Sequence, residues 1–293
     1  MKNTGIDLTD YKQIRELFSR HGFRFSKSLG QNFLTAAWVP QRIAEEAGLD
    51  GQTGVVEIGP GVGCLTVELS RRAGRVVSIE LDRALMPVLA ETLTGCENVE
   101  VVFGDATKLD LKKIVDEDLG GLRPAVCANL PYNVTSPLLT ALLEAGCFET
   151  ITVMIQREVA RRLCAGPGSA DYGAFGLFVQ WHCETELLFD VPPSCFVPQP
   201  KVTSSVIRLT RREKPPVAVR DETLLFRVIR AAFNQRRKTL VNALASGLGM
   251  DKAQAETAIV RAGFSPQIRG EAIDIGGFAK ISDEISSLLR ADL

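Results

Sequence analysis

The stretch from 55 to 66 reads "VVEIGPGVGCLT" and decides the fold. Its apolar start predicts a buried strand, and its end predicts the first turn of a helix. Between them, Gly59, Gly61 and Gly63 form a G-x-G-x-G turn that lets the backbone approach a ligand beside a helix N-terminus. The dinucleotide fingerprint requires glycine at position 64, where this chain has Cys64, which disfavours NAD and FAD.

Further strand patterns continue on the C-terminal side of this turn. Apolar runs alternate with helical patterns, which is typical of a mainly parallel sheet covered on both faces. The expected strands are 54–59, 75–81, 99–105, 124–130 and 151–156, and two more apolar stretches follow at 176–189 and 204–211. The sequence therefore predicts a Rossmann-like α/β fold.

The tail of the chain has a different character. "RREKPPVAVRDE" (211–222) has charge and proline but no apolar periodicity, and it predicts a linker. Beyond it the patterns are helical, with Asp251 as an N-cap and "SPQ" (265–267) as a further helix start. We therefore expect an α/β domain over 1–212, opening with a helix at 9–21, and an all-α domain over 213–293.

Composition limits the class of protein. The 293 residues carry a net charge of −1, so any nucleic-acid footprint must be local. The sequence has no apolar run of membrane-spanning length and no signal-like N-terminus. Seven scattered cysteines and two histidines disfavour a zinc site, and they indicate free thiols in a reducing cytoplasm.

Two acidic residues follow the glycine turn, each at the end of an expected strand. A carboxylate at Glu80 can accept hydrogen bonds from both hydroxyls of a ribose. Asp105 can receive the amino group of an adenine. Three glycines with two such acids suit S-adenosylmethionine, which has a ribose and an adenine but no pyrophosphate. A glycine-rich loop by itself is about as often a plain tight turn as a cofactor site.

The fourth expected strand ends on "NLPY" (129–132). Pro131 has no N–H, so Asn129 and the Leu130 carbonyl present acceptors that can hold a substrate amine. Tyr132 offers a flat face on which a base can stack. This arrangement suits methylation of a poorly nucleophilic ring amine, and the alternative is a plain turn.

Five motifs together resemble the ribosomal RNA adenine dimethyltransferases. They are "GQNFL" (30–34), "EIGPGVG" (57–63), "NLPY" (129–132), "FVPQPKVTSSV" (196–206) and "AFNQRRKTLVNAL" (232–244), and they span nearly the whole chain. The likeness is strongest to the branch that dimethylates two adjacent adenosines near the 3′ end of 16S rRNA. It implies action on the small ribosomal subunit in the cytoplasm, as a monomer without metal.

The resemblance also implies site residues. Asn32 and Leu34 join Gly59, Gly61, Glu80, Asp105 and Asn129 around the cofactor, and Phe196 closes on the target base opposite Tyr132. Phe196 is alternatively a core anchor for its proline-flanked loop. The basic loop before "GQNFL" contains Arg24 and Lys27, to which the resemblance assigns no role.

A basic run follows the linker. We expect Arg230, Arg236, Arg237 and Lys238, with Arg227, to lie along one helix and contact RNA phosphates, although such runs are usually solvated. Arg24, Lys27 and Lys201 are the other basic candidates.

The function has three rivals. They are a large-subunit (23S) rRNA methyltransferase, a non-catalytic nucleic-acid-binding factor and a small-molecule methyltransferase. The basic tail argues against the first and third, and intact Glu80, Asp105 and "NLPY" argue against the second.

Overall fold

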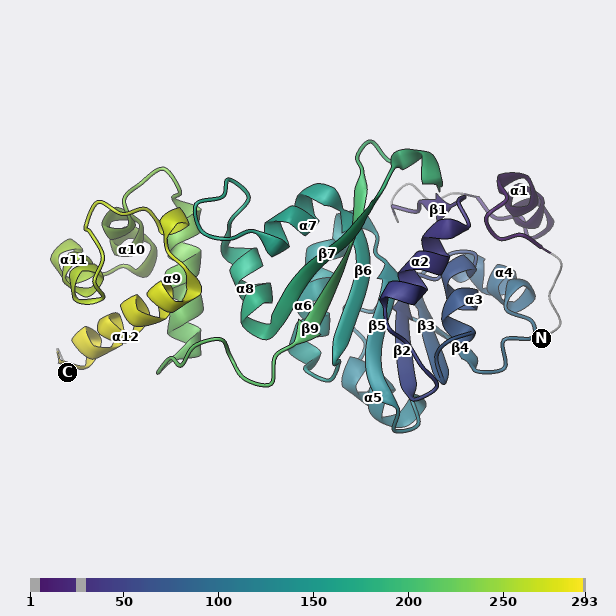
Figure 1. Ribbon diagram of the computed structural model, residues 1–293, viewed down its shortest axis with the longest axis horizontal. Coiled ribbons are helices and arrows are strands. Elements are labelled where there is room, and N and C mark those ends of the chain that lie inside the picture. The colour runs from purple at the N-terminus through teal and green to yellow at the C-terminus, as the bar shows by residue number, and fades with distance from the viewer. Residues whose placement is uncertain (1–5, 25–29, 292–293) are drawn as a thin grey trace. The chain divides into compact units, whose positions relative to one another are not determined.

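A seven-stranded sheet organises the larger part of the computed structural model, which describes residues 6–24 and 30–291 (Figure 1). Its strand order is β4-β3-β2-β5-β6-β9-β7. Neighbours from β4 to β6 pair in parallel, and β9 is antiparallel to β6, which confirms the predicted mainly parallel sheet. The strands are β2 (Thr53–Ile58), β3 (Arg75–Glu80), β4 (Val99–Phe103), β5 (Arg123–Asn129), β6 (Thr150–Gln156), β7 (Cys183–Val191) and β9 (Ser204–Arg211).

Helices connect the parallel strands. They are α3 (Cys64–Ser70), α4 (Met86–Thr92), α5 (Leu111–Asp118) and α6 (Thr135–Ala145), while α2 (Trp38–Glu46) precedes the first strand of the sheet. All six residues of β2 are buried, so both faces of the sheet are covered at its centre. In the sheet, β3 lies beside β2 on one side, and β5, which comes later in the chain, lies beside β2 on the other side. This reversal leaves a crevice at the carboxyl ends of β2 and β5, where open α/β sheets bind ligands.

The N-terminal segment begins with α1 (Tyr11–Arg20), close to the predicted helix at 9–21. Asp10 caps it, accepting from the Gln13 amide at 3.0 Å. Further along, β1 (Phe33–Leu34) pairs antiparallel with β8 (Phe196–Val197) in a second, two-stranded sheet. This pairing joins the "GQNFL" and "FVPQP" motifs, which lie far apart in the sequence.

The chain forms two compact units, and their boundary differs from the expected cut at 212. One unit comprises 1–160 with 186–211, and the other comprises 161–185 with 212–293. The difference arises because buried side chains of 161–185 share the apolar core of the C-terminal helices. Tyr172 and Trp181 belong to that core, and the Tyr172 hydroxyl donates to the Ile273 carbonyl oxygen at 3.0 Å.

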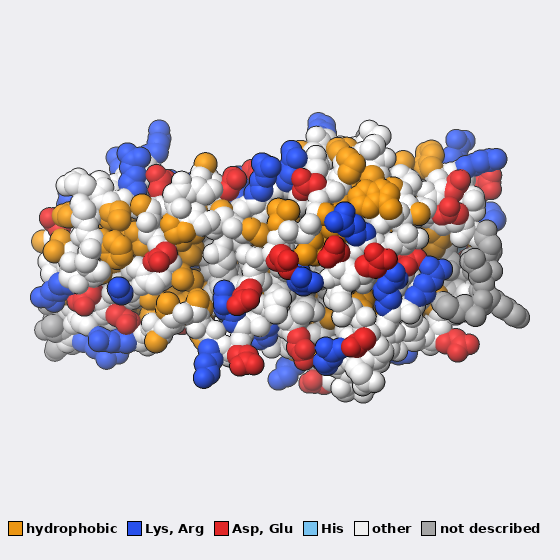
Figure 2. Space-filling model, viewed as in Figure 1, with side chains coloured by type: hydrophobic (Ala, Val, Ile, Leu, Met, Phe, Trp, Pro, Cys, Tyr) orange, Lys and Arg blue, Asp and Glu red, His pale blue; other side chains and the backbone are white. Residues whose placement is uncertain are grey.

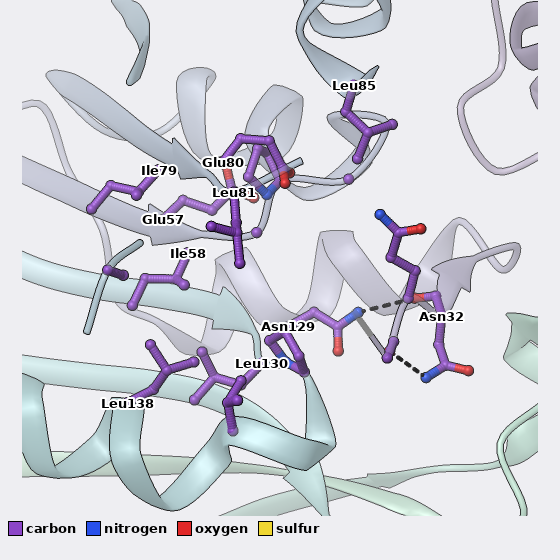
Figure 3. Close-up of a pocket in the computed structure, with 18 of the residues that line it drawn as sticks. Asn32, Glu57, Ile58, Ile79, Glu80, Leu81, Leu85, Asn129, Leu130 and Leu138 are labelled. Atoms are coloured by element: carbon purple, nitrogen blue, oxygen red, sulfur yellow. Dashed lines mark hydrogen bonds between the residues drawn. The ribbon is translucent and has the colours of Figure 1, made fainter. Parts of the chain in front are cut away.

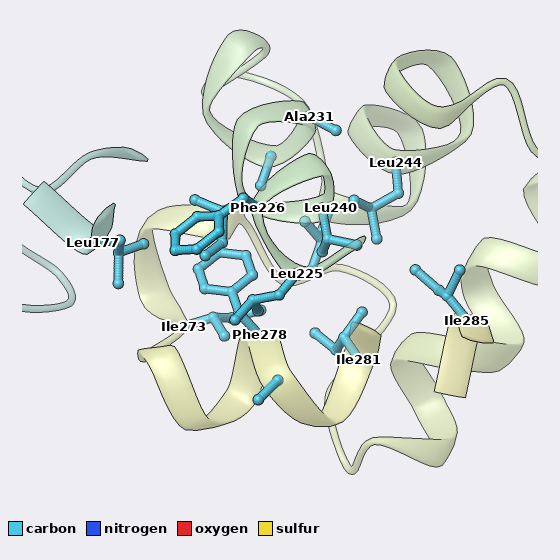
Figure 4. Packing of buried hydrophobic residues seen from close by; sticks show 14 of the residues in the cluster. Leu177, Leu225, Phe226, Ala231, Leu240, Leu244, Ile273, Phe278, Ile281 and Ile285 are labelled. Carbon is cyan, nitrogen blue, oxygen red and sulfur yellow. The ribbon is translucent and has the colours of Figure 1, made fainter. Parts of the chain in front are cut away.

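The helices at the boundary and in the second unit complete the fold. They are α7 (Arg157–Cys164), α8 (Ala174–His182), α9 (Glu222–Asn234), α10 (Leu240–Leu248), α11 (Lys252–Arg261) and α12 (Ile275–Ala291). Figure 4 shows side chains from α9, α10 and α12, among them Leu225, Leu240 and Phe278, packed around one apolar centre. The apolar stretch expected at 176–189 contains most of α8 and the first part of β7, so it is a helix followed by a strand.

Two expectations for the C-terminal helices were wrong and one was confirmed. The helix carrying the basic run ends at Asn234, so Arg236, Arg237 and Lys238 lie in the turn before α10. Residues 265–267 form a turn in which the Ser265 hydroxyl accepts from the Gln267 amide at 3.2 Å, and no helix starts there. Asp251 does cap α11, accepting from the Ala253 amide at 2.7 Å.

Across the residues that the structure describes, no helix is long and apolar enough to span a membrane. None of the seven cysteines, all of which lie in the described part of the chain, forms a disulfide.

Candidate active site

A cavity of about 310 Å³ opens at the carboxyl ends of β2, β3 and β5 (Figure 3). Its volume falls within the range of small-ligand sites. The predicted site residues that line it are Asn32, Leu34, Gly59, Gly61, Glu80, Asp105, Asn129, Leu130, Pro131 and Tyr132. Within the described part of the chain, no group of acidic, histidine or cysteine side chains could hold a metal ion.

The glycine turn has the conformation that its sequence predicts. Gly59, Gly61 and Gly63 have φ of +68°, +61° and +89°, where other residues are strained. A Cβ on Gly61 would lie 3.3 Å from the Phe33 ring, whereas one on Gly59 would meet nothing within 4 Å. Gly59 is therefore required for its backbone conformation, and Gly61 also for the close approach of Phe33.

Glu80 is the last residue of β3 and is 5% exposed. Its Oε1 accepts a hydrogen bond from the Asp82 amide at 2.7 Å. Burial raises the pKa of Glu80 above its usual value, and the backbone hydrogen bonds partly offset this. A buried carboxylate fixed in this way is oriented to accept hydrogen bonds from a polar ligand.

Asp105 lies in the loop after β4. Its Oδ1 accepts from the Thr107 hydroxyl at 2.6 Å and amide at 3.0 Å, and Lys108 Nζ lies 3.1 Å from Oδ2. The Thr107 hydroxyl, more than the other partners, lowers the pKa of this carboxyl. Asp105 is therefore an ionised acceptor at the cavity wall. Its oxygens already contact Thr107 and Lys108.

Asn129 and Asn32 connect two walls of the cavity. The Asn129 side-chain amide donates to the Asn32 carbonyl oxygen at 3.4 Å, and the Asn32 amide donates to the Gly30 carbonyl oxygen at 3.0 Å (Figure 3). This hydrogen bond orients the Asn129 amide, whose Oδ1 is an acceptor for another group. Leu34, which is 2% exposed, supplies apolar wall beside them.

The "LPY" residues turn the chain from β5 into α6. The Leu130 amide donates to the Met154 carbonyl oxygen at 3.1 Å, and the Pro131 carbonyl accepts from the Val134 amide at 3.3 Å. The Tyr132 hydroxyl shares a hydrogen bond with the hydroxyl of Ser204, at the start of β9. Burial raises the pKa of Tyr132, so this phenol is neutral near pH 7.

Phe196 is the one predicted catalytic residue that the structure does not bring to the cavity. Its side chain is fully buried, and its backbone pairs with Leu34 in the β1–β8 ladder. Phe196 packs in the apolar cluster that contains Val39 and Val191. In this arrangement it is an anchor for its loop, because a ring without exposed surface cannot stack on a base.

Glu57 lines the cavity and was missed among the sequence candidates. It is 1% exposed, and its Oε2 accepts hydrogen bonds from the Thr66 hydroxyl at 2.6 Å and the Ser78 hydroxyl at 2.7 Å. A signal was present in the sequence, since an acid within the apolar run "VVEIG" must be buried with the strand.

The predicted RNA-binding residues lie in the helical unit. Arg227 and Arg230 are exposed on α9, and Arg237 and Lys238 are exposed in the following turn. Arg236 is exposed as well, but its guanidinium donates to the Ala170 carbonyl oxygen at 3.0 Å and lies 3.9 Å from Glu271. Of the other basic candidates, Arg24 and Lys201 are exposed, and Lys27 lies outside the described residues.

The family model described as ribosomal RNA adenine dimethylase matches residues 22–270. Ribosomal RNA small subunit methyltransferase A of Geobacillus thermodenitrificans (strain NG80-2) is 45% identical over 289 residues, which cover 97% of this chain and 99% of that protein. The protein of the same name from Clostridium perfringens (strain SM101 / Type A) is 45% identical over 288 residues, which cover 97% of this chain and 100% of that protein.

The fold is also similar to those of solved RNA methyltransferase structures. A dimethyladenosine transferase from Plasmodium falciparum matches with a TM-score of 0.69 at 25% identity, covering 85% of this chain and 95% of that one. The 23S rRNA methyltransferase ErmE matches with a TM-score of 0.67 at 28% identity, covering 87% of this chain and 99% of that one.

Proposed function

The chain belongs to the ribosomal RNA adenine dimethylase family, and on that premise we propose that it dimethylates the N6 amines of two adjacent adenosines near the 3′ end of 16S rRNA. The observation that carries this proposal is the similarity to small-subunit methyltransferases along 97% of the chain, at 45% identity. That similarity includes both the cavity and the helical unit. We propose that the protein acts on the small ribosomal subunit, as a monomer in the cytoplasm.

S-adenosylmethionine is the cofactor that we propose for the cavity. Glu80 would accept from the ribose hydroxyls, and Asp105 from the adenine amino group, with Gly59 and Gly61 offering close backbone approach and Asn32 and Leu34 forming the wall beside Asn129. The buried, fixed carboxylate of Glu80 fits this role, because both ribose hydroxyls are donors. When bound, the cofactor supplies a methyl group on a positively charged sulfur.

The substrate amine would be held at the end of β5. Asn129 Oδ1 and the Leu130 carbonyl oxygen are acceptors that can bind its hydrogens and direct its lone pair. Pro131 keeps N–H donors away from the same corner. Tyr132, held through Ser204, would stack on the base with its ring. Phe196 would contact the base only if its loop left the core, so we propose a positioning role for Phe196.

The helical unit is the proposed RNA-docking surface. On the face shown in Figure 2, Lys and Arg are interspersed with Asp and Glu, which agrees with the near-zero net charge. Exposed Arg230, Arg237 and Lys238 are the proposed phosphate contacts, and Arg236 can contribute the N–H groups that Ala170 leaves free.

Action on the large subunit is the second candidate, because the fold is also similar to the 23S rRNA methyltransferase ErmE. The test is to incubate the protein with labelled S-adenosylmethionine and unmethylated small subunits, large subunits or naked 16S rRNA. The RNA is then digested and analysed for dimethyladenosine. We expect dimethyladenosine from small subunits. Product from large subunits alone would replace the proposal with the second candidate, and absence of methylated adenosine in every sample would refute both.

A further inference from the structure

Three consecutive residues of the "GQNFL" loop, Gly30, Gln31 and Asn32, line the cavity. Gly30 has φ of +64°, and a Cβ on it would lie 2.8 Å from Oδ1 of Asn133, the residue after "NLPY". The Asn32 carbonyl oxygen accepts from the side chain of Asn129. The loop therefore lies against the end of β5 on both sides of Gln31.

The side chain of Gln31 contacts a different wall of the cavity, at the end of β3. Its Nε2 donates to Oδ2 of Asp82 at 2.8 Å, across 51 residues of sequence, and both residues are half-buried. The other oxygen of Asp82 accepts from the Ala84 amide at 3.0 Å. A charged acceptor with an N–H donor on each oxygen holds a defined orientation. Gln31 thus fixes the turn after β3 to the "GQNFL" loop.

Asp82 also orients Glu80. The Asp82 amide donates to Oε1 of Glu80 at 2.7 Å, so the turn that Gln31 holds determines where the Glu80 carboxylate lies. Glu80 is the acid proposed for the ribose and Asn129 the amide proposed for the substrate amine, and Figure 3 shows them on different walls of the cavity. One continuous path of backbone and hydrogen bonds runs between these walls, and Gln31 is its middle.

We propose that Gln31 is a positioning residue, which acts through Asp82 to hold the Glu80 carboxylate where the ribose binds. The inference rests on the proposed function, because that function assigns the ribose to Glu80. A carboxylate that is held in place before binding loses less freedom when the ligand arrives, so it binds the ligand more tightly. Removal of the Gln31 donor therefore weakens cofactor binding although Glu80 itself is unchanged.

The experiment is calorimetry of ligand binding to the full chain, with S-adenosylmethionine and with 5′-methylthioadenosine. The second ligand keeps the adenosine, including the ribose hydroxyls, and lacks the amino-acid end. Gln31→Leu removes the donor at similar size, so it should weaken both ligands alike, by about three- to tenfold. Loss of affinity for S-adenosylmethionine alone would mean that Gln31 contacts the amino-acid end directly, and it would overturn the inference.

Exchange of the amide and the carboxylate tests the contact with Asp82. Gln31→Glu places two carboxylates against each other, so it should weaken both ligands by about tenfold or more. Asp82→Asn should have a small effect, because the Gln31 amide can turn and accept from the introduced amide. The combination of Gln31→Glu with Asp82→Asn again pairs an amide with a carboxylate, and it should restore both affinities to within about twofold of the wild type.

Gln52→Glu is the control for added charge. It introduces a carboxylate at an exposed residue before β2, at the amino end of the sheet, so it should leave both affinities unchanged. Circular dichroism checks that each variant is folded. If Gln31→Glu alone does not fold, Gln31→Leu and the combined variant still carry the test.

A role through Glu80 also predicts how substitutions combine. In Glu80→Ala, Gln31→Leu should weaken the ligands little further, because the carboxylate that it positions is absent. In the methylation assay, Gln31→Leu should raise KM for S-adenosylmethionine in the same proportion as it weakens binding. The value of kcat should change by about twofold or less, because Gly30 and Asn32 keep the loop against β5.

Two results would overturn the inference and leave the proposed cofactor standing. One is unchanged ligand affinity in a folded Gln31→Leu variant, and the other is failure of Asp82→Asn to restore Gln31→Glu. No binding of S-adenosylmethionine by the wild type would instead refute the cofactor and, with it, the inference.

Discussion

The side-chain amide of Asn129 donates to the backbone carbonyl oxygen of Asn32, at 3.4 Å, across 97 residues of sequence. This contact holds the strand that ends in "NLPY" against the "GQNFL" loop. It also orients the Asn129 amide, because Nδ2 is directed toward the Asn32 carbonyl oxygen, and Oδ1 is an acceptor for another group. The orientation suits the binding of an amine that has hydrogens to donate.

Replacement of Asn129 should affect catalysis more than binding. Asn129→Ala removes one acceptor that orients the amine, so turnover should fall by about 10²-fold or more, with little change in the affinity for small subunits. Single-turnover kinetics and a filter-binding assay measure the two effects. Equal losses in rate and in subunit affinity would show that Asn129 serves binding alone.

Glu80→Ala should weaken S-adenosylmethionine binding by about 1–3 kcal/mol, the cost of losing the hydrogen bonds that the ribose hydroxyls would donate to this carboxylate. The fold should survive, because Glu80 is at the last position of its strand and forms no ion pair with a described residue. Calorimetry gives the affinity, and thermal unfolding checks the fold. Unchanged affinity in a folded variant would mean that the ribose is bound elsewhere.

Two substitutions of Tyr132 distinguish the role of its ring from the role of its hydroxyl. Tyr132→Phe should remain largely active, because stacking uses the ring face, whereas Tyr132→Ala should lower both rate and RNA affinity. Loss of the contact with Ser204, which is fully buried, should reduce stability by about 1 kcal/mol in the phenylalanine variant.

Ser204→Ala is the matched control for Tyr132→Phe. It removes the same hydrogen bond from the other side, so it should show a similar loss of stability in urea unfolding and retain activity. An inactive Tyr132→Phe beside an active Ser204→Ala would assign the phenol hydroxyl a role in the reaction.

Arg236 and Arg237 should behave differently, although they are adjacent. Arg237→Ala should weaken small-subunit binding and lower the slope of log affinity against log salt by about one, as expected for a lost phosphate contact. Arg236→Ala should change that slope less. Its main effect should be faster hydrogen exchange in the loop 165–173, to which Arg236 is bonded through Ala170.

A salt titration of both single variants, with S-adenosylmethionine affinity as the control, measures this difference. The combined substitution Arg236→Glu with Arg237→Glu should weaken subunit binding and leave the cofactor affinity intact. If the double variant binds subunits like the wild type at every salt concentration, the basic turn is solvated surface. The contacts would then be sought around Arg24 and Lys201.

Local sequence patterns determined the parts of this protein that depend on neighbours in the chain. The apolar run of β2 and the glycines after it predicted a strand and a turn, because glycine adopts a left-handed backbone far more readily than other residues do. Parallel strands then bring their carboxyl ends to one rim. For that reason the positions of Glu80 and Asn129, each last in its strand, predicted that they would line one cavity.

Only the tertiary structure decided the features that depend on distant residues. Phe196 is buried because β8 pairs with β1, more than 160 residues earlier, and no local pattern contains that pairing. Residues 161–185 join the helical unit because Tyr172 and Trp181 fill its core. Arg236 is engaged because its turn passes Ala170, and Glu57 has hydroxyl partners because α3 and β3 pack beside β2. The free energy of these contacts comes from burial and hydrogen bonding between segments that meet only in the folded chain.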